Sequence, residues 1–204
     1  MDCQLSFSIL ENQSTRRITM EKNPSVYLSP SVQDYNEYII GGNEEYYMNL
    51  IADAMVPYLR ASNIDFTRNN PNDSLSQVID QSNAGEYDLH VALHSNSSPE
   101  NIAGILQGPD VYYYACSTDG EKAANIFAKN LMNIYPNPDL VTVIPNTTLA
   151  ELRRTRATSI LLELAYHDNY QDATWIANSI DPIARNLVQS LTQYFGIPFI
   201  MPYA

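Results

Sequence analysis

Cysteine and positively charged residues are scarce in this chain, and each shortage excludes a class of protein. Two cysteines among 204 residues, Cys3 and Cys116, cannot build a disulfide framework, so a reducing compartment is the simpler expectation. Only 11 Lys and Arg residues stand against 23 Asp and Glu residues, which gives a net charge of −12. Because a phosphate backbone is bound by basic patches, we expect no nucleic-acid partner.

Long apolar runs and a secretory leader are also missing. No apolar run approaches the roughly 20 residues that a helix needs to cross a bilayer, so we expect no membrane insertion. The opening residues, Met1 to Leu5, lack both the basic segment and the apolar segment that mark a signal peptide. The expectation is a protein made in the cytoplasm that reaches any target outside the cell after release or lysis.

From Val26 onwards the sequence alternates between strand and helix patterns. Short apolar runs predict strands at 26–28, 64–67, 88–94, 111–116, 140–144 and 159–165. Amphipathic segments predict helices at 44–59, 74–82, 119–134, 172–180 and 182–195. This order predicts a single α/β domain over 25–204, with a mostly parallel, twisted sheet and helices on both faces. Residues 1–24 stand apart as an N-terminal extension or a hairpin of 4–10 with 15–20.

A carboxylate interrupts the apolar run that ends this strand pattern. Glu163 lies in Ser-Ile-Leu-Leu-Glu-Leu-Ala-Tyr, residues 159–166, which is typical of a buried strand. Burying an ionised carboxylate costs several kcal/mol unless it is paired, protonated or bound to a cation. Glu163 is therefore either a catalytic group or part of an ion pair. The candidate ion-pair partners lie just upstream: Arg153, Arg154 and Arg156.

The chain has only three histidines, His90, His94 and His167. On a strand, His90 and His94 would stand about 13 Å apart, so they should not share a metal ion. His94 lies at the carboxyl end of its strand, where α/β sheets bind ligands, whereas His90 is expected to be a structural or surface residue. His94 and a glutamate from 44 or 45 could hold Zn²⁺, with Glu163 taking a proton from an activated water.

Four segments, in their order and spacing, carry a resemblance to a known family. These are Glu45-Tyr-Tyr-Met-Asn49, the strand Tyr87 to Asn96, Gly104 followed by Val111 to Tyr114, and Leu161 to Asn169. They resemble blocks of the zinc-dependent N-acetylmuramoyl-L-alanine amidases of the type 3 group, which occur in bacterial autolysins, sporulation lysins and phage endolysins. The resemblance spans 26–199 and implies that a metal-activated water hydrolyses the amide between N-acetylmuramic acid and L-alanine in peptidoglycan.

The resemblance also implies residue roles. Glu45, four residues before Asn49, and His94 would bind Zn²⁺, and Glu163 would be the general base. Glu44 would then be a solvated charge in the first turn of its helix. Asn96 and Asn169 are expected to contact substrate, although either could instead cap an element, Asn169 at the helix that starts near residue 172.

One departure from the family pattern concerns the first zinc ligand, a histidine in a Gly-His-Gly-Gly-like turn after the first strand. The corresponding turn here reads Leu-Ser-Pro-Ser-Val-Gln-Asp, residues 28–34, without a histidine. Gln33, Asp34 or His167 could fill the place, or the site could hold metal weakly or not at all. Two alternatives to the amidase follow: a metal-free peptidoglycan-binding module of the same fold, and a zinc-dependent hydrolase of small soluble amides.

Overall fold

The computed structural model describes residues 22–202, so the hairpin expected at 4–10 and 15–20 lies outside the described residues. Within that range one six-stranded sheet has the order β2-β1-β3-β6-β4-β5. The strands are β1 (Ser25–Pro30), β2 (Asp65–Arg68), β3 (Leu89–Asn96), β4 (Asp110–Tyr114), β5 (Thr142–Asn146) and β6 (Ser159–Tyr166).

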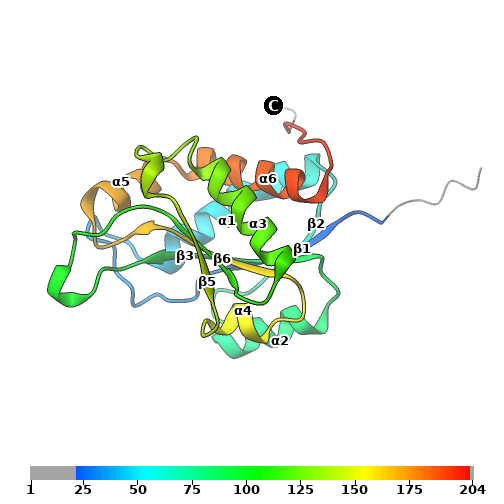
Figure 1. Cartoon of the computed structure of the whole chain (residues 1–204), viewed down its shortest axis with the longest axis horizontal. Coiled ribbons are helices and arrows are strands. Elements are labelled where there is room, and N and C mark those ends of the chain that lie inside the picture. The colour runs from blue at the N-terminus through cyan, green and yellow to red at the C-terminus, as the bar shows by residue number, and fades with distance from the viewer. Residues whose placement is uncertain (1–21, 203–204) are drawn as a thin grey trace, which may run out of the picture.

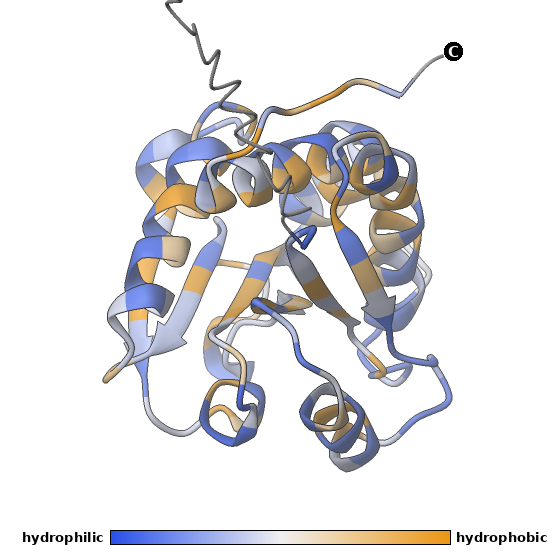
Figure 2. Cartoon of the chain, turned by 90° about the vertical axis from the view of Figure 1, so that its right-hand side faces the viewer, coloured by the Kyte–Doolittle hydropathy of each residue, from blue (hydrophilic) through white to orange (hydrophobic). Residues whose placement is uncertain are grey.

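Helices cover both faces of this sheet, as expected. They are α1 (Glu44–Ala61), α2 (Leu75–Ala84), α3 (Thr118–Leu131), α4 (Ala150–Arg154), α5 (Tyr170–Asn178) and α6 (Ile180–Phe195), with short 3-10 turns η1 (Glu100–Ile102) and η2 (Pro138–Leu140). Helices α1, α3 and α6 lie over one face and α2 and α4 over the other (Figure 1). The apolar sides of the helices turn towards the sheet (Figure 2). The predicted single α/β domain is confirmed.

Strand direction decides which chain segments meet at the edge of the sheet. Strands β2, β1, β3 and β6 run parallel to one another, whereas β4 is antiparallel to β6 and β5 is parallel to β4. As a result β4 begins at the edge where β3 and β6 end. Its first residue, Asp110, pairs with Glu163.

Side-chain alternation in β3 and β6 places apolar core residues on one face of the sheet and the polar candidate site residues on the other. Leu89, Val91 and Leu93 belong to the main apolar core, which α1, α3 and α6 complete. The intervening His90 and His94 point to the opposite face, where α2 and α4 lie. His94 pairs with Glu163 of β6, so the two side chains stand next to each other on this face.

Most predicted boundaries are confirmed to within a few residues, and the caps explain where the helices start. The side chain of Asn43 accepts a hydrogen bond from the Tyr46 amide, and Ser74 forms a capping box with Gln77. Strand β5 starts two residues later than predicted because 138–140 form a 3-10 turn with Pro138 at its start. Helix α4 was not predicted: five residues are too few for a periodic pattern.

Candidate active site

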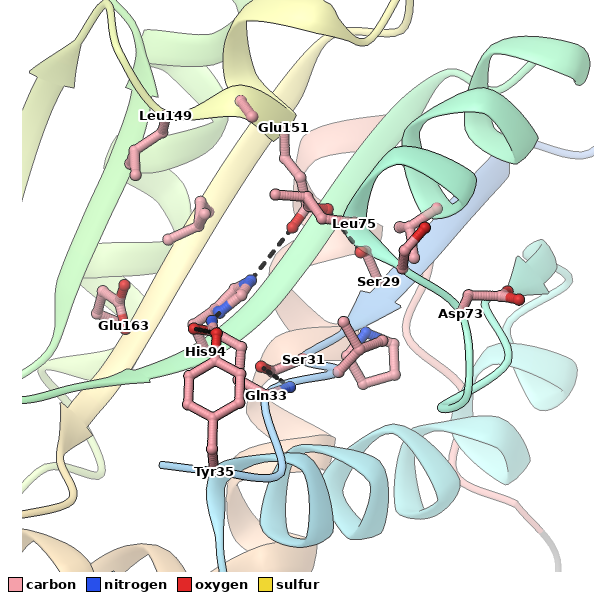
Figure 3. Close-up of a pocket in the computed structure, with 16 residues that line it drawn as sticks. Ser29, Ser31, Gln33, Tyr35, Asp73, Leu75, His94, Leu149, Glu151 and Glu163 are labelled. Atoms are coloured by element: carbon pink, nitrogen blue, oxygen red, sulfur yellow. Dashed lines mark hydrogen bonds and ion pairs between the residues drawn. The ribbon is translucent and has the colours of Figure 1, made fainter. Parts of the chain in front are cut away.

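A pocket of about 420 Å³ opens on the α2/α4 face, where β1 and β3 end. Its wall is largely apolar, with Pro30, Val32 and Leu161 among the residues that form it. His94 and Glu163 point into it, and Glu151 reaches it from α4 (Figure 3). This is the edge at which parallel α/β sheets bind ligands, as expected from the sequence.

His94 is the centre of the polar contacts in this pocket. Its Nδ1 lies 2.8 Å from Oε1 of Glu44 and 3.2 Å from the side-chain amide nitrogen of Gln33. Its Nε2 lies 3.2 Å from Oε1 of Glu151. Burial alone would lower the pKa of His94, but its hydrogen bonds to Glu151 and Glu44 outweigh burial and raise the pKa well above the usual value.

The structure brings Glu44, rather than Glu45, to His94. The prediction that Glu44 is a solvated charge is wrong, because only 1% of Glu44 is exposed. Asn36 donates to its carboxylate at 2.6 Å. Burial would raise the pKa of Glu44, but the hydrogen bond from His94 lowers it. Glu45 is half-buried and accepts a hydrogen bond from Asn49 instead. Successive helical residues point about 100° apart, so only one of the two glutamates can face the histidine.

Glu151 is the site residue that sequence reasoning missed. It is 4% exposed and accepts hydrogen bonds from His90 at 2.7 Å and Ser29 at 2.5 Å, in addition to the contact with His94. Burial would raise the pKa of Glu151, but the bonds from the two histidines lower it. His90 is thus the structural histidine of the two alternatives considered. The two histidines reach one carboxylate although they are four residues apart on a strand. The only signal in the sequence was a glutamate between apolar residues 149, 150 and 152.

Glu163 stands out because one of its oxygens has no partner. Its Oε2 is buried without a hydrogen bond among residues 22–202. Burial raises the pKa of Glu163 to about 7, although the positive charge of His94 opposes the rise. The expected alternative, an ion pair with a nearby arginine, is not seen among the ion pairs of the described residues. Arg153 and Arg154 are exposed, and Arg156 contacts Asn83.

The structure places His167 away from His94. Its Nδ1 lies 3.1 Å from the carbonyl oxygen of Ser95, and its ring stacks on Tyr38 with centroids 5.5 Å apart. Tyr38 belongs to the main core on the other side of the sheet. Asp34, another candidate for the missing ligand, is exposed. Of the candidates considered, only Gln33 lies beside His94.

The two residues predicted to contact substrate, Asn169 and Asn96, differ in the hydrogen bonds that their side chains make within the protein. Asn169 caps α5, since its Oδ1 accepts from the backbone amides of Gln171 and Asp172. Its amide group also donates to the carbonyl of Gly104 at 2.7 Å, so the capping alternative is confirmed. Asn96 is half-buried at the end of β3, and its side chain bonds the amide of the next residue.

The donors fit a metal ion only as a reduced set. Among residues 22–202, no three His, Cys, Asp or Glu side chains are arranged to hold a metal ion. Two strong donors, His94 Nδ1 and the Glu44 carboxylate, do lie together, but Gln33 turns its amide nitrogen to His94 while its amide oxygen accepts hydrogen bonds from Tyr35 and Asn36. Amide oxygen binds zinc less well than imidazole, so this set is weaker than one with a second histidine.

These features are typical of a hydrolytic enzyme on an α/β fold: a pocket at strand ends, a histidine–carboxylate pair and a carboxylate whose pKa burial raises to about 7. The sequence profile of the family described as N-acetylmuramoyl-L-alanine amidase matches residues 32–193. The chain belongs to this amidase family, and the family expected from the sequence is confirmed.

Solved amidase structures share the fold at low sequence identity. The amidase AmiC2 of Nostoc punctiforme is 17% identical with a TM-score of 0.74, over 85% of this chain and 98% of that one. An amidase from Clostridium difficile 630 is 16% identical with a TM-score of 0.75, over 86% and 98%. The catalytic domain of the CD27L endolysin, which targets Clostridia difficile, is 21% identical with a TM-score of 0.66, over 83% and 96%.

Two further comparisons are negative. No curated protein sequence matches the chain. Among the helices of residues 22–202, none combines the length and the apolar character required to cross a membrane.

Proposed function

We propose that this pocket hydrolyses the amide that joins the lactyl group of N-acetylmuramic acid to L-alanine in peptidoglycan. The observation that carries the proposal is the pairing of Glu163 with His94 on neighbouring strands, with one Glu163 oxygen buried and unpartnered. Membership of the amidase family supplies the substrate class and the reaction.

Glu163 acts as general base and then as general acid. Its carboxylate takes a proton from the attacking water and passes it to the nitrogen of L-alanine as the amide bond breaks. Because burial raises the pKa of Glu163 to about 7, the side chain can be proton acceptor and donor at neutral pH. Glu163 lines the pocket, where its carboxylate can accept a hydrogen bond from that water.

The chain's own donors would hold one Zn²⁺ at Nδ1 of His94. Glu44 takes the place that the resemblance gave to Glu45, and Gln33 would complete the set only by turning its amide oxygen, which here accepts a hydrogen bond from Tyr35, towards the ion. The bound ion would supply the Lewis acidity that polarises the scissile carbonyl and lowers the pKa of a bound water. The neutral Gln33 makes weak zinc binding an expected property of this centre.

Peptidoglycan is the proposed partner, and the cell wall is where the protein would act. The apolar wall formed by Pro30, Val32 and Leu161 suits the methyl groups of the lactyl and alanyl units. Tyr35, which is 72% exposed at the pocket, offers a ring for a sugar to stack on. Asn96 at the end of β3 remains a proposed substrate contact.

A second function is favoured by two observations. Both ring nitrogens of His94 are bonded to carboxylates, and the turn 28–34 lacks the family's histidine. A protein that binds peptidoglycan without metal and without hydrolysis would show the same features.

Incubation with sacculi and soluble muropeptides, with Zn²⁺ added, separates the two functions. We expect the wild-type protein to release stem peptides with a free amino-terminal L-alanine, as identified by mass spectrometry. The Glu163→Gln variant keeps the shape of the side chain and should be slower by about 100- to 10,000-fold, the range of general base catalysis. Binding to sacculi without any peptide release would support the binding module and contradict the amidase.

A further inference from the structure

The pocket at the strand ends is lined by apolar and acidic side chains. Three carboxylates line it, those of Asp73, Glu151 and Glu163. Glu151 and Glu163 lie on two sides of His94, one from α4 and one from β6 (Figure 3). Among the described residues that form the lining, none is Lys or Arg. The pocket therefore presents several acceptors and negative charges to a ligand.

His94 is the one lining side chain that can carry a positive charge, and both of its ring nitrogens already have partners. Its Nδ1 lies 2.8 Å from Glu44, and its Nε2 lies 3.2 Å from Glu151. An anionic group that approached either nitrogen would meet a carboxylate there. Like charges that come together where water is largely excluded repel each other strongly.

The arginines nearest to the pocket in the fold are turned away from it. Arg68, at the end of β2, is paired with Asp53 and bonded to Asn49, both on α1. It therefore faces α1, on the other side of the sheet from the pocket. Arg153 and Arg154 are exposed at the carboxyl end of α4, whereas the amino end of α4 borders the pocket.

The chemistry of the stem peptide places an acidic group close to the cleaved bond. The residue after L-alanine is a D-glutamate whose chain continues through its γ-carboxyl group, so its α-carboxyl group is a branch that is either free or amidated. Two residues of chain span at most about 7 Å, so this branch stays close to Glu163. A short stem peptide fits a pocket of about 420 Å³ between the starts of α2 and α4. The glycan strand, which continues in both directions, would lie outside.

We propose that this pocket selects stem peptides whose D-glutamate carries an amidated α-carboxyl group over those in which that group is a free carboxylate. The inference rests on the proposed function, because it names the form of the substrate that the same site takes. A primary amide is neutral, and its nitrogen donates hydrogen bonds to carboxylates such as that of Glu151. A free carboxylate only accepts, so it would lose its water without gaining a cationic partner.

An equimolar mixture of two muramyl tripeptides, incubated with the wild-type protein and Zn²⁺, tests the preference directly. Both substrates end in L-lysine, and they differ only in whether the α-carboxyl group is an amide or an acid. Mass spectrometry of the remaining substrates gives the ratio of the two kcat/KM values. We expect the amide to be consumed about 10- to 100-fold faster, the effect of leaving one charged group unpaired in the pocket. Equal consumption, or faster consumption of the acid, would overturn the inference.

A cation introduced into the pocket should weaken the preference. Leu75, the first residue of α2, lines the pocket and is 44% exposed, so a polar residue is tolerated there. In Leu75→Lys the new ammonium group can pair with the free carboxylate, and the preference for the amide should fall by about 2- to 5-fold. Leu75→Gln, of similar length and without charge, is the matched control and should keep the wild-type ratio. Equal ratios in the two variants would overturn the inference.

Binding of the same tripeptides to chelator-treated wild-type protein, measured by calorimetry, separates this inference from the proposed function. Tighter binding of the amide together with no cleavage of either substrate when Zn²⁺ is added would remove the amidase function and leave the selection intact. Cleavage of both substrates at equal rates, with equal affinities, would remove the selection alone.

Discussion

Glu163 illustrates how one residue is used for reactivity at the expense of stability. Its pKa of about 7 in the folded protein lies above the 4.5 of a free side chain. The folded state therefore binds more protons than the unfolded state, and stability falls as the pH rises from about 4.5 through 7. The cause is a carboxylate with one buried oxygen that no partner satisfies.

Glu163→Gln should therefore stabilise the chelator-treated protein at pH 8 while it slows hydrolysis by about 100- to 10,000-fold. The gain in the free energy of unfolding should be on the order of 3 kcal/mol at most, because one pKa unit corresponds to about 1.4 kcal/mol. At pH 5 the gain should be much smaller, since wild-type Glu163 is then mostly protonated. Urea unfolding of both proteins at the two pH values gives the comparison. A difference independent of pH would contradict the assignment.

The neighbours Glu44 and Glu45 provide a matched pair for the metal site. Glu44→Gln should weaken zinc binding by more than the about 10- to 100-fold expected for an outer partner, because it removes a direct donor. Glu45→Gln should leave the affinity close to that of the wild type, because its carboxylate faces Asn49. Zinc affinities of the two variants, measured by competition with a chelator, decide between Glu44, which the structure favours, and Glu45, which the family resemblance favours. Weaker zinc binding by Glu45→Gln than by Glu44→Gln would instead identify Glu45 as the zinc ligand.

The sequence predicts the site residues that lie near strand ends. It does not predict those whose role depends on the direction in which a helical side chain points. His94 and Glu163 follow from strand patterns that stop at a polar residue. Glu44 and Glu45 differ only in which way they point, and the contact of Glu44 with Asn36 settles that direction. No sequence pattern of comparable strength marked Glu151 as a site residue.

At the scale of elements, periodicity found every strand of the sheet and all helices but one. The one missed, α4, makes a single turn or so, and its place is fixed by packing of Leu152 against Ala92 and Leu161. The reversed direction of β4 and β5 also has no local signal, because the same alternation fits either direction. Both features depend on contacts between distant segments.

The start of α5 gives a prediction at the same scale. Asn169→Ala removes both the cap and the bond to Gly104, so the free energy of unfolding should fall by about 1–2 kcal/mol. Asn133→Ala, at an exposed residue after α3, should change it by less than about 0.5 kcal/mol. Thermal and urea unfolding supply the values. Unchanged stability together with a raised KM for muropeptides would instead support a substrate contact by Asn169.

At the scale of the whole molecule, the net charge of −12 should affect how readily the protein associates with the cell wall. Sacculi that keep their anionic polymers should repel the protein at low salt, whereas small muropeptides should not. Raising the ionic strength from about 0.01 to 0.15 M shortens the screening length from about 30 to 8 Å. We expect this change to speed the cleavage of such sacculi but not of soluble muropeptides. An equal salt response for both substrates would contradict this account.

Hydrolysis in water labelled with ¹⁸O tests the central claim, cleavage between the lactyl carbonyl and L-alanine, most directly. Mass spectrometry of the products should find one label in the lactyl carboxylate of N-acetylmuramic acid and a free, unlabelled amino-terminal L-alanine. Glu163→Gln should give neither product above background. A label in a carboxylate of the stem peptide, or no labelled product with Zn²⁺ present, would contradict the account.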